Sequence, residues 1–237
     1  MKITCVATAL GSLLVFLLNP IPLLSNDEIT QKKSQEILEK IRNKYVPVYK
    51  KYRGVQSLQT IISKELEFER VVSTTTVTIS RKDYFYDNYP DTVVVKYEKN
   101  GNQMKASDYK EGKYLPTFPV FDEKSGERYD TSVTGYEMIE GKKCYRIKVV
   151  PKGMTMQYLM GNYYFTVQNL NLVMFDGTLA KLPPACRDYN MKMFFNQQGD
   201  IAVVKESTIN LRIVIPLLYE GQFSSITTVS QCTPIPY

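Results

Sequence analysis

Apolar and polar residues alternate with a period of two along most of the chain beyond residue 55. Successive side chains of a β-strand point to opposite faces of a sheet, so this alternation predicts half-buried strands. Gly-containing dipeptides typical of hairpin turns separate the alternating segments, which indicates antiparallel pairing. The spacing predicts a strongly curved sheet or open barrel of about eight to eleven strands. The turns are expected at Asn100-Gly101, Glu111-Gly112, Ser125-Gly126, Glu140-Gly141, Gln198-Gly199 and Glu220-Gly221.

Between residues 27 and 53 the apolar period lengthens to that of a helix. Asn26 and Asp27 are expected to cap its start, and Pro47 to kink or end it. The sequence therefore predicts an α+β fold that is mainly antiparallel β, with an N-terminal helix and with short helices or loops as a lid. The apolar stripe of the helix consists of Ile37, Leu38, Ile41 and Tyr45.

The positive charge of the chain is concentrated on this helix. Residues 27–53 hold eight Lys or Arg and four Asp or Glu, a net charge of +4 out of +6 for the whole chain. A basic amphipathic helix is typical of contact with a membrane or an acidic partner. The alternative, which we favour, is a solvated helix whose apolar stripe packs on the sheet. No basic strand studded with aromatic residues stands out, so nucleic-acid binding is not expected.

The first 25 residues have the three parts of a secretory signal peptide. Lys2 precedes an uncharged apolar run over residues 3–18, and a polar stretch with two prolines ends at Ser25. This run is shorter than the roughly 20 residues that span a bilayer, so an uncleaved anchor helix is the less favoured alternative. We predict residues 1–25 as a signal peptide and residues 26–237 as one exported domain, soluble in the periplasm or another extracytoplasmic compartment.

Three cysteines remain in the predicted mature chain, namely Cys144, Cys186 and Cys232. An odd number allows at most one internal disulfide, with Cys186 to Cys232 as one possibility and buried free thiols as the other. Their spacing matches no zinc motif, and no metal site is expected.

The residues needed for common catalytic sites are absent from the sequence. The chain has no histidine, which excludes Ser-His and Cys-His nucleophilic systems and removes the commonest metal ligand. Phosphate-binding glycine motifs and the Gly-x-Ser-x-Gly elbow are also missing, so neither a cofactor nor an enzymatic activity is expected. Glu65, Glu67 and Glu69 alternate with apolar residues, which most simply indicates a solvent-facing strand face rather than paired glycosidase carboxylates.

Two stretches, residues 104–134 and 153–161, interrupt the strand pattern and are candidate flaps over a cavity. Methionine adapts its shape to varied apolar ligands, although a methionine cluster alone more often reflects ordinary packing of a loop on the core. The predicted lid residues of the second stretch are Met154, Met156, Leu159 and Met160.

The order of these segments resembles the outer-membrane lipoprotein carrier (LolA/LolB-like) superfamily. The helix is followed by the segment Tyr52-Arg53-Gly54-Val55-Gln56-Ser57-Leu58. Further along the chain, residues 135–147, from Gly135-Tyr136 to Arg146-Ile147, form a predicted hairpin. The resemblance implies an incomplete β-barrel with helices in its opening and an apolar cavity that accepts acyl chains. The chain departs from the pattern in lacking Trp, in a Pro-rich insertion near Pro116, and in its Pro234-Ile235-Pro236-Tyr237 tail.

Two hypotheses for function follow. The first is a periplasmic carrier of lipoprotein acyl chains or other lipids, which takes part in lipoprotein sorting to the outer membrane. The second is an envelope sensor or scaffold that uses the same fold to bind another protein at its sheet edge or basic helix. The expected cavity lining of the carrier is Leu66, Phe68, Tyr84, Tyr86, Val95, Tyr97, Ile147, Val149, Phe165, Met191, Met193 and Ile213.

Overall fold

A computed structural model describes residues 29–67, 69–86, 90–109, 119–216 and 218–237. The predicted signal peptide and the turn at Glu111-Gly112 lie outside this part of the chain, as does Phe68.

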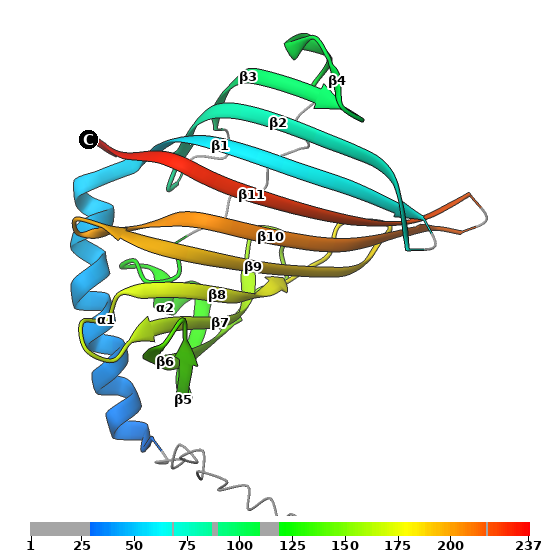
Figure 1. Cartoon of the computed structure of the whole chain (residues 1–237). Helices are drawn as coiled ribbons and strands as arrows, with labels where there is room; N and C mark the ends of the chain where they lie inside the picture. Colours follow the sequence, from blue (N-terminus) through cyan, green and yellow to red (C-terminus); the bar gives the residue numbers. More distant parts are fainter. Residues whose placement is uncertain (1–28, 68, 87–89, 110–118, 217) are drawn as a thin grey trace, which may run out of the picture.

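Within the described residues, eleven strands form one antiparallel sheet, which is strongly curved and not closed (Figure 1). The strand order is β4-β3-β2-β1-β11-β10-β9-β8-β7-β6-β5, so that the first and last long strands pair in the middle of the sheet. This confirms the predicted curved, open, mainly antiparallel architecture and its strand number. The strands are β1 (Tyr52–Glu67), β2 (Arg70–Tyr84), β3 (Asp91–Lys99), β4 (Asn102–Gln103), β5 (Tyr129–Ile139), β6 (Lys142–Pro151), β7 (Leu159–Thr166), β8 (Leu172–Leu179), β9 (Cys186–Gln198), β10 (Ile201–Ile215) and β11 (Tyr219–Pro236).

Three of the predicted turns join strands as expected. Asn100-Gly101, Glu140-Gly141 and Gln198-Gly199 separate β3 from β4, β5 from β6, and β9 from β10. Asn100 and Glu140 both have positive φ (51° and 47°) before a glycine, the geometry of the tightest hairpin turns.

Two predicted turns were wrong. Ser125-Gly126 opens the short helix α2 (Ser125–Arg128), and Glu220-Gly221 lies within β11 because the hairpin turns earlier, after Ile215. A glycine after Ser125 or Glu220 is compatible with helix or strand, so such a dipeptide alone does not define a turn.

The N-terminal helix α1 (Gln31–Lys51) crosses the strands at one end of the sheet (Figure 1). It begins at Thr30, whose side-chain oxygen accepts a hydrogen bond from the backbone N–H of Lys33 at 3.3 Å, rather than at the predicted caps. It also continues past Pro47 to Lys51, so the proline does not end it. A short 3-10 turn, η1 (Ala106–Asp108), follows β4.

The apolar stripe of α1 packs on the β5–β8 half of the sheet, on what we call the inner face. Ile41 is fully buried there, and the Tyr45 ring meets the Phe165 ring edge-on at 5.7 Å between centroids. Phe121 contacts Phe165 in the same way, at 4.9 Å. This confirms that the stripe is buried against the sheet, so the same residues are not available to a membrane. A smaller cluster lies on the outer face and consists of Ile139, Cys144, Tyr164, Val173 and Met174, with Phe194 packed against it.

Candidate functional site

The inner face extends beyond α1 along the β9, β10, β11 and β1 strands. Residues directly opposite in an antiparallel pair lie on the same face of the sheet. Met193 lies opposite Ser207, Ser207 opposite Thr227, and Thr227 opposite Ile61. The inner face is therefore continuous from the core under α1 to the central strand β1.

Half-buried apolar side chains occupy much of this extension, which we call the inner apolar surface. Those on β9 pack against the margin of the core, whereas those on β10, β11 and β1 join no buried cluster of the described residues. Large apolar side chains at intermediate exposure, side by side on one curved face, are the surface that a binding site for an apolar ligand needs. The members are Tyr189, Met191, Met193, Phe195, Ile209, Leu211, Phe223 and Ile61.

Hydroxyl groups on this face form hydrogen bonds with one another. Ser63 and Ser225 lie opposite each other, and their Oγ atoms are 3.0 Å apart. Such pairs lower the cost of placing hydroxyls beside an apolar ligand, because neither group loses a partner when water leaves.

The far end of the inner face, away from α1, carries an acidic group. Glu65 lies opposite Phe223, is half-buried, and accepts a hydrogen bond from the Tyr219 hydroxyl at 2.7 Å. This hydrogen bond is the largest cause that raises the pKa of Tyr219 to about 12. The expectation of three solvent-facing glutamates is therefore wrong for Glu65, although Glu67 and Glu69 are exposed. Successive side chains of a strand point to opposite faces, so the apolar Leu66, which follows Glu65 on β1 and lies opposite Gln222, points to the outer face.

The end of the inner face near α1 carries a buried polar group on β1 and β2. Arg81 Nε lies 2.6 Å from Asp83 Oδ1, and Gln59 Nε2 donates to Ser57 Oγ at 2.8 Å. Ser57 and Arg81 are both buried. The apolar surface is thus bounded by polar groups at both ends.

Cys232 lies opposite Ser57 beside this polar group. Burial, with a smaller contribution from the Asp83 carboxylate, raises the pKa of the Cys232 thiol to about 11. Since this exceeds the value of about 8.5 in an unfolded chain, the neutral thiol stabilises the fold, and this contribution is lost as pH rises through about 11.

Alkylation of Cys232 should therefore depend steeply on pH. We expect its rate with iodoacetamide to rise about tenfold per pH unit from pH 7 to 10 without a plateau, as followed by mass spectrometry. The same thiol in urea should level off near pH 8.5. A plateau near that pH in the folded protein would contradict the shifted pKa.

All three cysteines of the described chain are free. Cys186 lies opposite Ile213, which lies opposite Gly221, and Cys232 is eleven residues further along β11 (232 − 221). Eleven strand residues span roughly 36 Å. A disulfide needs Cα atoms within about 7 Å, so the considered Cys186–Cys232 bridge does not form within this fold.

The structure brings together some of the predicted lining residues and separates others. Ile147, Val149 and Phe165 are fully buried beneath α1, and Met191 and Met193 lie at the edge of that core. By strand register, Tyr97 and Ile213 share the inner face with them.

Four predicted lining residues lie elsewhere. Leu66 is on the outer face opposite Gln222, and Val95 is 61% exposed on β3. The hydroxyl of Tyr84 donates to Asp91 at 2.9 Å, and that of Tyr86 donates to Asp122 at 3.1 Å. Alternation alone placed all of these inside, because it does not say which of two faces is covered.

Of the four predicted lid residues, two lie in the loop before β7 and two lie in β7 itself. Met154 is exposed and Met156 half-buried in the loop after β6, whereas Leu159 and Met160 already belong to the strand. Leu159 is only 3% exposed and is part of the core.

Sequence reasoning missed a charged cleft of about 630 Å³ beside the last turns of α1. Asp122 is 3% exposed in it and accepts hydrogen bonds from Tyr86 and Arg128. Burial raises the pKa of the Tyr86 hydroxyl well above its usual range, and the Asp122 carboxylate adds to this. No local pattern signals the cleft, since its members come from distant segments. The lining is Val46, Tyr49, Lys50, Tyr86, Asp122, Glu123, Lys124, Arg128 and Tyr237.

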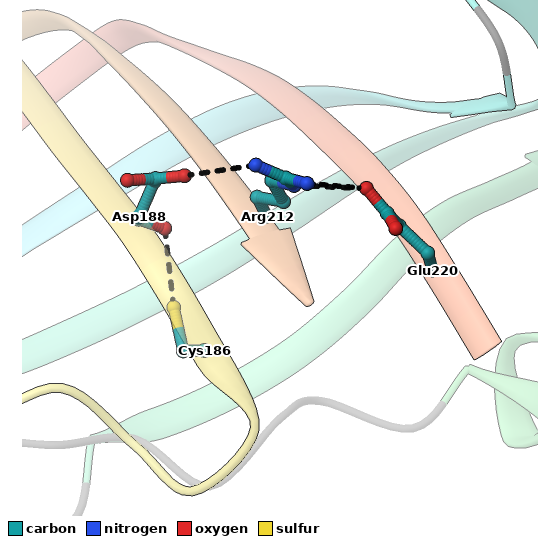
Figure 2. A network of polar contacts seen from close by, with 4 residues as sticks. All are labelled: Cys186, Asp188, Arg212 and Glu220. Carbon is teal, nitrogen blue, oxygen red and sulfur yellow. Dashed lines mark hydrogen bonds and ion pairs between the residues drawn. The ribbon is translucent and has the colours of Figure 1, made fainter. Parts of the chain in front are cut away.

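A second, shallow groove of about 600 Å³ lies mainly on the outer face of β9, β10, β11 and β1. Arg212 stands between two carboxylates there: its Nη2 is 2.6 Å from Glu220 Oε1 and its Nη1 is 3.9 Å from Asp188 Oδ2 (Figure 2). Cys186 donates its S–H to the Asp188 carbonyl at 3.2 Å. All these charged groups are well exposed, so their pairing contributes little stability.

Within the described part of the chain, no group of acidic, Cys or His side chains has the arrangement of a metal site. No helix among the same residues is long and apolar enough to cross a membrane.

Comparison of the chain with known proteins finds solved structures with similar folds. No family model matches the sequence, and no curated protein matches it. A domain assigned to outer membrane lipoprotein sorting in Vibrio parahaemolyticus is similar in structure, at 9% identity and a TM-score of 0.42, covering 86% of this chain and 92% of that one. A LolA superfamily protein from Nitrosomonas europaea is similar at 8% identity and a TM-score of 0.43, covering 86% and 94%.

MucB in its complex with MucA, from Pseudomonas aeruginosa, is similar at 8% identity and a TM-score of 0.28, covering 84% of this chain and 99% of that chain. One of these similar structures is described as a LolA superfamily protein, and that superfamily is the one that the sequence resembles. Identities of 8–9% and TM-scores of 0.28–0.43 are too low to assign a function.

Proposed function

We propose that the protein is an extracytoplasmic carrier that binds acyl chains, of lipoproteins or of other lipids, on its inner apolar surface. The observation that carries this proposal is the row of half-buried apolar side chains that begins on β9 at the margin of the packed core and continues on β10, β11 and β1 outside it. Export through residues 1–25 remains part of the proposal.

The energetics favour an apolar ligand without polar specificity. Each Å² of apolar surface removed from water contributes about 25 cal/mol, so an acyl chain laid along several strands gains binding energy in proportion to its length. Methionines at positions 191 and 193 adapt to chains of different shape. The loop with Met154 and Met156, at the start of β7, would act as the lid over the bound chain.

A lysine on the inner apolar surface should abolish this binding. We expect Met193→Lys or Leu211→Lys to lower the affinity for palmitate more than tenfold, because the chain would have to desolvate an ammonium group. Leu211 lies outside the packed core, so its variant separates loss of binding from loss of folding. The measurements are isothermal titration with palmitate and mass spectrometry of lipid extracted from natively purified protein.

Met138→Lys is the matched control, since Met138 is 48% exposed on β5 and outside the inner apolar surface. It should bind palmitate like the original protein. Palmitate binding that survives Leu211→Lys, or natively purified protein without any lipid, would count against the carrier.

An envelope sensor or scaffold that binds another protein is the second candidate. It is favoured by the exposed edge strand β3, and by the solvated basic face of α1, where Lys32 and Lys40 are exposed and available to an acidic partner. One variant distinguishes the two candidate functions. Leu211→Lys would remove lipid binding and would leave intact a protein contact made through the β3 edge or through α1.

A further inference from the structure

The strand β3 is an incompletely paired edge of the sheet. One side of it pairs with β2 along most of its length. On the other side, within the described residues, only Glu98 and Lys99 pair with β4, and the Tyr97 carbonyl accepts a hydrogen bond from Met104 at 2.9 Å. Residues 91–96 therefore present backbone N–H and C=O groups to no neighbouring strand of the described chain (Figure 1).

The side chains on this free stretch are apolar and exposed. Val93 is 65% exposed and Val95 is 61% exposed, among the highest values for apolar residues of the described chain. Natural proteins protect such edges with charges, prolines or covering segments, because a bare apolar edge pairs with other strands.

The opposite edge of the sheet shows such protection. The backbone N–H of Val133 on β5 donates to the Ser34 hydroxyl of α1 at 3.0 Å. Gly135, where the register of β5 shifts, disrupts the same edge further along. Among the described residues, no comparable contact covers residues 91–96. The β5 edge is therefore partly protected, whereas this stretch of the β3 edge is open to another strand.

We propose that β3 pairs antiparallel with β3 of a second copy of this chain, which would join two sheets across a two-fold axis. Antiparallel pairing suits the charges of the strand. Asp91 begins the free stretch, whereas residues 96–99 contain two lysines and one glutamate, a net charge of +1. Each acidic end therefore meets the basic end of the other copy, and the exposed valines of both copies come together. The contact is independent of lipid binding.

The interface is small and the dimer accordingly weak. Six or seven residues on each side bury less than the standard interface of about 1,600 Å², so association is expected only in the micromolar to millimolar range. Sedimentation velocity from about 1 μM to about 1 mM should show a reversible monomer–dimer equilibrium. Hydrogen exchange of the backbone amides of residues 92–96 should slow as the dimer forms.

The decisive variant is Val93→Lys combined with Val95→Lys. Both side chains are exposed in the monomer, so folding should be retained, as a thermal melt by circular dichroism would verify. Like charges facing each other across the axis should weaken association about tenfold or more. Val150→Lys is the matched control, since Val150 is a 37% exposed valine on β6, which is paired on both sides.

Four results would overturn the proposal, and the first three concern this chain alone. They are a monomer at every concentration, a dimer that the double variant leaves unchanged, and exchange protection that appears only outside residues 92–96. Slowed exchange that requires a different protein rather than this chain would assign the edge to that partner, and would equally overturn pairing between copies.

Discussion

Replacement of Phe165 by alanine is expected to lower the free energy of unfolding by about 3–5 kcal/mol, because it leaves a cavity at the centre of the core. Phe165 is fully buried, and its ring meets those of Tyr45 on α1 and Phe121 edge-on. These ring contacts join α1, the segment before α2 and the sheet. Because the three elements hold one another in place, they cannot easily move in to fill the cavity left by the missing ring. Urea denaturation followed by circular dichroism measures the change.

Phe223→Ala is the control for this prediction. Phe223 is half-buried on the inner apolar surface and joins no buried cluster of the described residues. Its loss should cost clearly less, about 1–2 kcal/mol. Equal costs at the two positions would mean that the inner apolar surface is as tightly packed as the core, which would also weaken the proposed acyl site.

Asp122→Ala is expected to lower the free energy of unfolding by about 3–5 kcal/mol, for an electrostatic reason. The carboxylate is 3% exposed and pairs with Arg128, whose side chain is 13% exposed. Its removal leaves a largely buried guanidinium without its carboxylate, and the Tyr86 hydroxyl loses an acceptor at 3.1 Å. A buried charge that loses its partner is among the most destabilising changes in proteins.

The matched control is Asp188→Ala on the outer face. The Asp188 side chain is 72% exposed and lies 3.9 Å from Arg212. Loss of this exposed pair should cost less than about 1 kcal/mol. A double variant, Asp122→Ala with Arg128→Met, should recover part of the stability lost in Asp122→Ala. If the double variant is less stable than the single variant, removal of the carboxylate from beside the Arg128 guanidinium is not the cause.

Much of the candidate site could be predicted from local sequence patterns. The residues that were placed on the wrong face were misplaced for a physical reason. Met191 and Met193 share the inner face with Phe165, as their alternation within β9 and β7 allowed. Leu66 lies on the other face although it alternates in the same way. A period of two fixes which residues share a face of one strand, but neighbouring strands must be paired before the faces of different strands can be matched.

The local structure of this protein follows from its residue pattern: the helix with its apolar stripe, the strands, and the hairpin turns where Asn100 and Glu140 precede glycine. These depend on periodicity and backbone preference, which act over a few residues. Three features could be seen only in the assembled fold: β1 pairs with β11, Glu65 faces inward while Leu66 faces outward, and Asp122 is buried against Arg128. Those features join segments far apart in the chain, and their stability comes from burial and pairing that exist only once the sheet has formed.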